Sequence, residues 1–207
     1  MSSTPRAHHE QKPSASHAGA APRLLEHYRK TIAPSLATAF KHKNPMAVAR
    51  LEKIVLNIGC GEAAHEAKVL EAAQRDLAAI SGQRPLVTRA KKAISNFKIR
   101  EQDPVGCKVT LRRARMYEFL DRLVSVALPR IRDFRGLDLR GFDHSGNYNF
   151  GLKEHTIFPE IQIERVTHPL GLDIAVVLRS ASREEAVVLL KEFGFPFKSL
   201  DSHERLQ

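Results

Sequence analysis

The sequence is poor in cysteine and has no long apolar run. Only Cys60 and Cys107 occur among 207 residues, far apart and without a Cys-x-x-Cys pair. This argues against a disulfide framework or a zinc site and fits a reducing compartment, so we expect two small buried apolar side chains. No apolar segment approaches the length that spans a membrane, which predicts no membrane partner. The length suits one good core, and a second full domain is not required.

The common catalytic patterns are also missing. No nucleophile elbow, Walker loop or paired-carboxylate arrangement occurs, and the ten histidines form no His-x-x-x-His or His-Glu-x-x-His pattern. Histidines and acids come close together in one long loop, as His144 and His155 with Asp143 and Glu154, and we expect these to be solvated loop side chains. The sequence therefore predicts a protein that is not an enzyme and has no metal or cofactor.

The two ends of the chain differ from its middle. Residues 1–22 are rich in Ser, Ala, His and Pro and show little periodicity, which predicts a disordered N-terminal extension. An organellar transit peptide is an alternative, because acids are few, but prolines interrupt any amphipathic helix. A secretory signal is excluded by the lack of an apolar core segment, and a cytoplasmic location is preferred. We expect one domain over residues 23–198 and a C-terminal tail over 199–207.

Hydrophobic periodicity predicts a mixture of helices and strands without strict alternation. Helices are expected over 24–40 (weakened by Pro34), 63–80 and 115–128, with a last helix that starts at the capping sequence 182–185 and stops at Gly194. Strands are expected over 51–58, 85–90, 93–100, 105–112 and 172–178, and residues 132–151 as a loop. Short connections favour antiparallel pairing. The predicted fold class is α+β, an antiparallel sheet with helices packed on one face and the other face open.

Positive charge is concentrated in one window. Residues 84–115 contain ten Lys or Arg against two acids, Glu101 and Asp103, and so carry +8 of the formal +10 of the whole chain. Aromatic and amide side chains are set among these cations, which suits a polyanion that also offers bases for stacking and hydrogen bonding. The window therefore favours nucleic-acid binding over an ordinary solvated basic face.

Within this window, individual residues have two interpretations. Phe97 and Asn96 suit contact with an unpaired nucleotide, but Phe97 equally suits a core position on an alternating strand. Lys91 and Lys92 are poor core residues, and a projecting loop that contacts phosphate is their natural use. A second basic segment, 128–137, contains three arginines, and a salt-bridged surface turn is its simpler interpretation.

One short motif points to another class of protein. Residues 59–64 have the spacing G-x-G-x-x-A between an expected strand and an expected helix, where dinucleotide-binding folds hold a pyrophosphate. The next expected strand runs into lysines and does not end near the acid that would hold a ribose. A tight turn is the preferred interpretation, and a nucleotide-binding enzyme that uses Gly59 to Ala64 is the less favoured alternative.

Several motifs together resemble one family, the bacterial large-subunit ribosomal proteins number five, which bind 5S ribosomal RNA. In order along the chain they are LNIGCG at 56–61, ISGQRP at 80–85, TRAKK at 88–92, GCKVTLR at 106–112, LPRIRDFRG at 128–136, FD at 142–143, GNY at 146–148, IFPEI at 157–161 and FPFK at 195–198. The resemblance covers about residues 24–198. Members of the family usually begin near the first expected helix and stop soon after residue 198, so the resemblance assigns no role to the extension or the tail.

The resemblance implies a structural constituent of the large ribosomal subunit that helps to anchor 5S ribosomal RNA in the central protuberance. By the match, Asn57, Gln83, Phe97 and Thr110 fall where the family contacts that RNA. We add Arg100, Lys108 and Arg112 because they belong to the same basic strands. The implied neighbours in the ribosome are 23S ribosomal RNA and adjacent large-subunit proteins.

Two further partners follow from the resemblance. One segment corresponds to the loop that family members extend towards the elbow of the transfer RNA in the peptidyl site: Lys91, Lys92, Ala93, Ile94, Ser95 and Asn96. Residues 134–148 correspond to the region near the bridge to a protein of the small-subunit head. A generic basic RNA-binding or assembly module remains the main alternative. His144 stands where the family usually has a glycine, and 168–170 depart from the family pattern, which bears on the C-terminal partner contacts.

Overall fold

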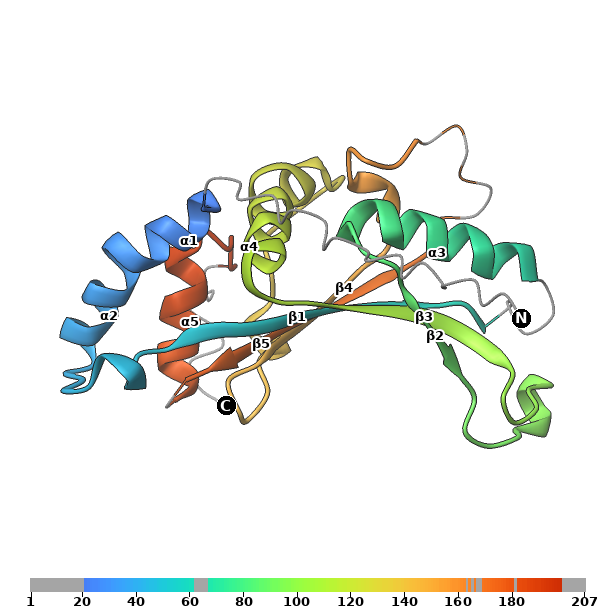
Figure 1. The fold of residues 1–207 in the computed structure, drawn as a ribbon, viewed down its shortest axis with the longest axis horizontal. Helices are drawn as coiled ribbons and strands as arrows, with labels where there is room; N and C mark the ends of the chain where they lie inside the picture. Colours follow the sequence, from blue (N-terminus) through green and yellow to red (C-terminus); the bar gives the residue numbers. More distant parts are fainter. Residues whose placement is uncertain are drawn as a thin grey trace, which may run out of the picture.

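The computed structural model describes residues 21–61, 67–162, 164, 166, 169–180 and 182–198. Its centre is a five-stranded sheet in the order β2-β3-β1-β5-β4, and every neighbouring pair is antiparallel. The strands are β1 (Arg50–Gly59), β2 (Leu86–Arg89), β3 (Pro104–Leu111), β4 (Tyr148–Leu152) and β5 (Leu172–Arg179). Figure 1 shows the long central strands crossing the molecule with helices above them.

The sheet has one buried face because apolar residues alternate along its strands. In β1, Ile54, Leu56 and Ile58 are fully buried, whereas Val55 and Asn57 between them are only partly covered. In β5 the same alternation buries Leu172, Ile174, Val176 and Leu178. The core therefore lies between this face and the helices, and the intervening residues form the opposite face.

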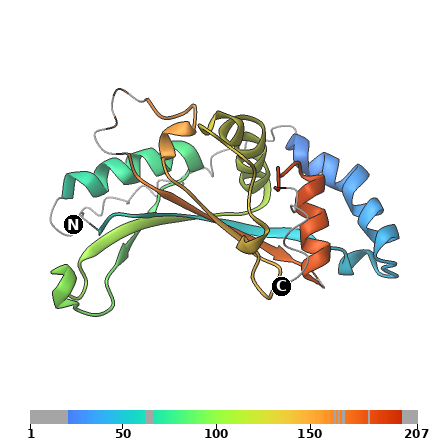
Figure 2. The same ribbon diagram turned by 180° about the vertical axis from the view of Figure 1, so that it is seen from behind.

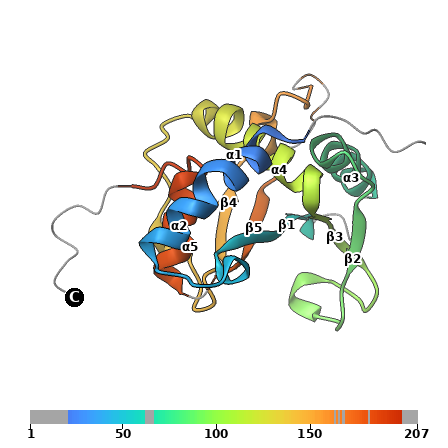
Figure 3. The ribbon, with the colours of Figure 1, turned by 60° about the vertical axis from the view of Figure 1, so that its left-hand side comes forward.

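Five α-helices pack around the buried face: α1 (Arg23–His27), α2 (Ala33–Ala39), α3 (Ala67–Ser81), α4 (Arg113–Arg122) and α5 (Arg183–Glu192). Helices α3 and α4 cover the sheet from one side in both opposite views (Figures 1 and 2). Helices α1, α2 and α5 gather at the end of the sheet farthest from the β2–β3 loop (Figure 3). No helix in the described part of the chain is long and apolar enough to cross a membrane. The predicted α+β class, with a sheet that has helices on one face, is confirmed.

Most of the expected elements are found, with differences at two prolines. The first helix is divided into α1 and α2 by a π-turn over Tyr28–Ile32, with Pro34 in the first turn of α2. The predicted helix over 115–128 starts as α4, continues through a π-turn (Leu123–Ala127) and closes in a 3₁₀ turn that contains Pro129. Gly82 and Gly194 have positive φ angles of 66° and 88°, as expected for glycines that end helices.

Two predictions about strands are wrong. Residues 93–100 do not form a strand: they fold back on themselves through a 3₁₀ turn (Ser95–Phe97), and Ile94 and Ile99 bond to each other across it. Residues 132–151, expected as a loop, contain most of β4, which pairs with the outer edge of β5. The predicted extensions 1–22 and 199–207 lie outside the described residues, apart from residues 21 and 22.

The predicted helix cap at Ser182 gives a stability test. Its Oγ accepts a hydrogen bond of 3.2 Å from the backbone N–H of Glu185, which satisfies one donor of the first turn of α5. Ser182→Ala is expected to lower the free energy of unfolding by about 1 kcal/mol, measured by urea denaturation. Ser182→Asp keeps an acceptor and should remain close to the wild type. Equal losses in both variants would contradict a capping role.

Candidate nucleic-acid interface

The face of the sheet opposite α3 and α4 presents mainly polar and small side chains, with one large exposed apolar residue (Leu86), in two rows that run across the strands. Strand register places one row in the order Leu86, Lys108, Asn57, Asp173 and Gly151. The second row contains Thr110, Val55, Ala175 and Asn149. We call these two rows, with Lys53 and Arg112 beside them, the open face. The composition of the open face is typical of a surface that binds a polar partner and is not typical of a hydrophobic core.

Five of the predicted RNA-contact residues lie together on or beside the open face. Asn57 and Lys108 are directly paired across β1 and β3, and Thr110 is two residues farther along β3. Gln83 approaches from the turn before β2, where its Nε2 donates to the backbone oxygen of Thr110 at 3.0 Å. Arg112 follows the end of β3, and its guanidinium lies 4.0 Å from Glu52. The fold therefore brings together residues that are up to 55 positions apart in the sequence, Asn57 to Arg112.

The other two predicted RNA contacts, Phe97 and Arg100, lie on the β2–β3 loop. This loop (residues 90–103) projects beyond the strands on the side of the sheet away from α3 (Figures 1 and 2). It is organised by backbone bonds between Ile94 and Ile99 and between Ala90 and both Gln102 and Asp103. Lys98 has a positive φ angle of 53°, which turns the chain at the tip of the loop, and Gln102 has one of 70° at its base.

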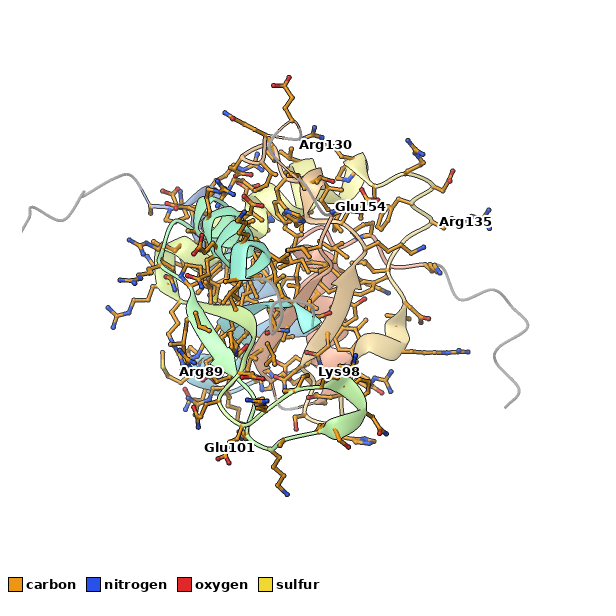
Figure 4. All side chains as sticks on the ribbon, turned by 90° about the vertical axis from the view of Figure 1, so that its right-hand side faces the viewer. Arg89, Lys98, Glu101, Arg130, Arg135 and Glu154 are labelled. Atoms are coloured by element: carbon orange, nitrogen blue, oxygen red, sulfur yellow. The ribbon has the colours of Figure 1, made fainter. Side chains whose placement is uncertain are left out.

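The tip of the loop is exposed. Residue Phe97 is 69% exposed and Ile94 47%, so the interpretation of Phe97 as a core aromatic is wrong. Lys91, Lys92, Lys98 and Arg100 are all exposed, and none forms an ion pair with a carboxylate of the described residues. Figure 4 shows Arg89 at the end of β2 and Lys98 and Glu101 on this loop, all well separated from Arg130, Arg135 and Glu154. The predicted use of Lys91 to Asn96 as a projecting, accessible segment fits this geometry.

The seven predicted residues thus form two groups. Thr110 and Gln83 lie at one end of β3, and the loop that carries Phe97 and Arg100 leaves from the other end, at Pro104. At about 3.3 Å per residue, the six steps from Pro104 to Thr110 span roughly 20 Å. A single nucleotide cannot reach both groups. The surface is long enough for an extended stretch of nucleic acid.

The open face also contains charged residues that the sequence analysis missed. Lys53 of β1 pairs with Val177 of β5, and Arg179 continues the same alternation two residues later. Lys53 and Arg179 both lie outside the basic window 84–115, and only the pairing of the strands brings them onto the same face as Lys108. The missed signal was the alternation of β5, in which Asp173, Ala175, Val177 and Arg179 occupy every second position.

The G-x-G-x-x-A motif does not lie in a dinucleotide-binding fold. That fold needs parallel strands joined by a crossover helix, whereas β1 is antiparallel to both of its neighbours, β3 and β5. Residues 62–66 of the motif and of the predicted helix start lie outside the described residues.

Cys60 and Cys107 are free and buried, as expected. Burial, and secondarily the neighbouring Cys60, raises the pKa of the Cys107 thiol to about 12, so it stays protonated at neutral pH.

One histidine prediction is wrong. His144 is exposed, but His155 is completely buried. Its Nε2 lies 3.2 Å from Oδ2 of Asp76 in α3, and its Nδ1 lies 3.1 Å from the backbone oxygen of Leu170. The Asp143 carboxylate accepts from the Asn147 side-chain amide and from the backbone N–H groups of Asn147 and Ser145, and these bonds hold the pKa of its carboxyl below the ordinary value. Both residues therefore hold loops in place.

Residues 134–148 are anchored to the core by aromatic packing. The ring of Tyr148 lies 4.6 Å from Phe142 and 5.3 Å from Phe197, centroid to centroid, and its hydroxyl donates to the backbone oxygen of Asp138 at 2.9 Å. Beside this cluster is a surface depression of about 560 Å³. Its rim carries four cations and two acids: Arg132, Arg135, Lys153, Lys198, Asp133 and Glu154. The surface is mixed in charge and distant from the β2–β3 loop (Figure 4).

Comparisons with known proteins agree across the chain. A family model described as "Ribosomal protein L5" matches residues 44–100, and one described as "ribosomal L5P family C-terminus" matches residues 104–197. Similar proteins named "Large ribosomal subunit protein uL5" include those of Variovorax paradoxus, 55% identical over 86% of this chain and 99% of the relative, and Chlorobaculum tepidum, 56% identical over 85% and 96%. That of Clostridium tetani is 53% identical over 85% and 98%.

Proposed function

The chain belongs to the ribosomal protein L5 family, a family of structural ribosomal components, and from this membership we propose that it binds 5S ribosomal RNA through its open face. In doing so it helps to anchor that RNA in the central protuberance of the large subunit. Neighbouring 23S ribosomal RNA and large-subunit proteins complete its surroundings, and we place it in ribosomes of the cytoplasm. We take residues 23–198 as the single RNA-binding domain.

The observation that best supports this proposal is the row of directional and charged groups across β3 and β1. Lys108 and Thr110 are exposed, and Asn57 lies beside Lys108 in register. Lysines neutralise phosphates and release counterions, whereas amide and hydroxyl groups supply bonds to base edges and sugars. The β2–β3 loop adds an exposed aromatic ring on which a base can stack.

The direct test is binding of the full chain to 5S ribosomal RNA and to another folded RNA of similar length, each titrated with salt. A preference for 5S ribosomal RNA of about 4 kcal/mol or more is expected of a specific nucleic-acid complex. Equal affinities that fall together as salt rises would instead indicate a generic basic RNA-binding or assembly module. That result would contradict the proposed specific binding of 5S ribosomal RNA.

Lys108→Ala should weaken this binding and change its salt dependence. The side chain is exposed on the β3 part of the open face and has no ion-pair partner among the described residues, so its removal costs little stability. The slope of log K against log salt should decrease in magnitude by roughly 0.7 to 0.9. Lys191→Ala on α5 is the matched control. An unchanged slope for Lys108→Ala would place the phosphates elsewhere.

A second contact involves the β2–β3 loop. We propose that residues 91–96 touch the transfer RNA in the peptidyl site, because the loop projects from the sheet and its cations are accessible. Hydroxyl-radical cleavage from a probe attached to the thiol of the Lys92→Cys variant tests this in assembled ribosomes. Cleavage at the transfer RNA elbow is the expected result, and cleavage only of ribosomal RNA would contradict it.

We further propose that residues 134–148 lie near the bridge to a protein of the small-subunit head. Anchoring by Phe142 and Tyr148 gives this region a defined shape, and arginines beside it remain exposed.

A nucleotide-binding enzyme has no support from the fold, since the sheet lacks the parallel pairing that its pyrophosphate site requires.

A further inference from the structure

A shallow depression lies on the open face where β1, β5 and β4 run side by side. Its volume is about 330 Å³, and it is lined mainly by Val55, Asn57, Asn149, Gly151, Asp173 and Ala175. Strand register places Gly151 and Asn57 on either side of Asp173. Small residues form its floor and amide or carboxylate groups its margin, so it suits a flat, partly polar group.

Asp173 is the unexpected member of this surface. It is exposed, and no cation of the described residues forms an ion pair with it, although the open face carries Lys108, Lys53 and Arg179. A carboxylate repels phosphate and therefore does not assist backbone binding. It only accepts hydrogen bonds, so a ligand that uses it must present donors.

The neighbours of Asp173 leave it open to such a ligand. Asn57 Nδ2 donates to Asp173 Oδ2 at 3.3 Å, which turns the Asn57 amide so that its own Oδ1 remains an acceptor. On the other side, a Cβ added to Gly151 would be in van der Waals contact with Asp173 Oδ1, at 3.4 Å. Because residue 151 is glycine, that oxygen faces the depression unobstructed. Because a carboxylate oxygen can accept more than one hydrogen bond, both oxygens of Asp173 are available to a ligand at this margin.

We propose that this depression receives an unpaired guanine of the bound RNA and that the Asp173 carboxylate accepts from its N1–H and N2–H groups. Guanine is the base that presents two adjacent donors on its Watson–Crick edge. Adenine and cytosine present one exocyclic amino group beside an acceptor nitrogen, and uracil presents one N–H between two carbonyl oxygens. Those acceptors would face the carboxylate and be repelled. This proposal rests on the proposed function and adds a base preference to it.

The isosteric substitution Asp173→Asn distinguishes base reading from general electrostatics by the sign of its effect. Removal of a negative charge from a basic surface should tighten generic RNA binding. Loss of the paired acceptors should instead weaken binding to 5S ribosomal RNA about ten-fold. Glu52→Gln, which removes the acid that lies 4.0 Å from Arg112, is the matched control and should not weaken binding. Thermal unfolding checks that both variants remain folded.

Footprinting with kethoxal, which modifies N1 and N2 of unpaired guanines, identifies the base. The full wild-type chain should protect a guanine of 5S ribosomal RNA that Asp173→Asn leaves reactive, and inosine at that position should lower wild-type affinity but not that of the variant. Selective binding by the wild type with the same footprint and affinity for Asp173→Asn overturns the guanine site alone. Absence of selective binding by the wild type overturns the proposed function and the guanine site together.

Discussion

Replacing Phe97 with alanine is expected to weaken binding of 5S ribosomal RNA by about 1–3 kcal/mol, or roughly five-fold to 150-fold, with almost no change in stability. Phe97 is 69% exposed at the tip of the β2–β3 loop, so its ring contributes little to the core. The loop is held by backbone bonds, such as the pair between Ile94 and Ile99, that do not involve this side chain. Binding titration and urea denaturation of the same preparation measure both quantities.

Met46→Ala is the appropriate control for Phe97→Ala. Met46 is 70% exposed on a 3₁₀ turn (Pro45–Ala47) between α2 and β1, at the opposite end of the molecule. Removal of the Met46 side chain takes away an exposed apolar surface similar to that of Phe97, at a position where no base is expected to stack. Normal affinity of the Phe97 variant would assign the ring to another partner or to solvent. A large loss of stability would contradict the loop geometry.

The loop around Phe97 was mispredicted for a local reason. Residues 93–100 contain branched and aromatic side chains and no glycine or proline, which favours a strand. The chain reverses because Lys98 adopts a left-handed conformation, with φ 53°, and L-residues other than glycine seldom do so. Composition did predict that the segment is basic and accessible. It did not predict the reversal that exposes Phe97.

The missed strand β4 has the opposite cause. Tyr148, Phe150 and Leu152 alternate with Asn149 and Gly151, which is a strand pattern, but the evenly spaced glycines favoured a loop. Gly151 weakens the intrinsic preference of an edge strand that only its partner β5 supports. Without β4 in the sheet, the depression around Asp173 cannot be recognised from the sequence.

The residues of the candidate site were therefore predictable where they lie in one segment of the sequence. The prediction was incomplete where the site is formed by several strands. The window 84–115 identified Lys108 and Arg112 by charge alone. The contributions of Lys53, Asp173 and Arg179 depend on the pairing of β1 with β5, which lie more than 110 residues apart. Their polar positions alternate with core residues, but alternation alone does not say which strands become neighbours.

The connection between α2 and β1 shows how the end of the sheet is held. Ala49 is completely buried, so both of its backbone polar groups need partners. Its N–H donates to Glu185 Oε1 at 2.9 Å, and its oxygen accepts from the Tyr28 hydroxyl at 2.9 Å. His42 Nε2 lies 2.9 Å from the same Glu185 oxygen, and the Glu185 side chain is 1% exposed. One carboxylate on α5 thus supports a connecting segment from the other end of the chain.

Glu185→Ala should consequently lower the free energy of unfolding by about 3 kcal/mol, because it leaves the buried Ala49 N–H and the His42 ring without their acceptor. In a protein of this size that corresponds to a fall in Tm of roughly 6–12 °C. Glu185→Gln keeps an oxygen for Ala49 and removes only the charge, so an intermediate loss is expected. Glu184→Ala, at the exposed neighbouring position, should change stability by less than about 0.5 kcal/mol. If Glu185→Ala and Glu184→Ala have the same Tm, the bonds to Ala49 and His42 do not stabilise the fold.

The bonds made by Glu185 lie on the helix side of the sheet, at the end far from the β2–β3 loop. Below its Tm, the Glu185→Ala variant should therefore retain normal affinity for 5S ribosomal RNA, which separates folding from binding in this protein.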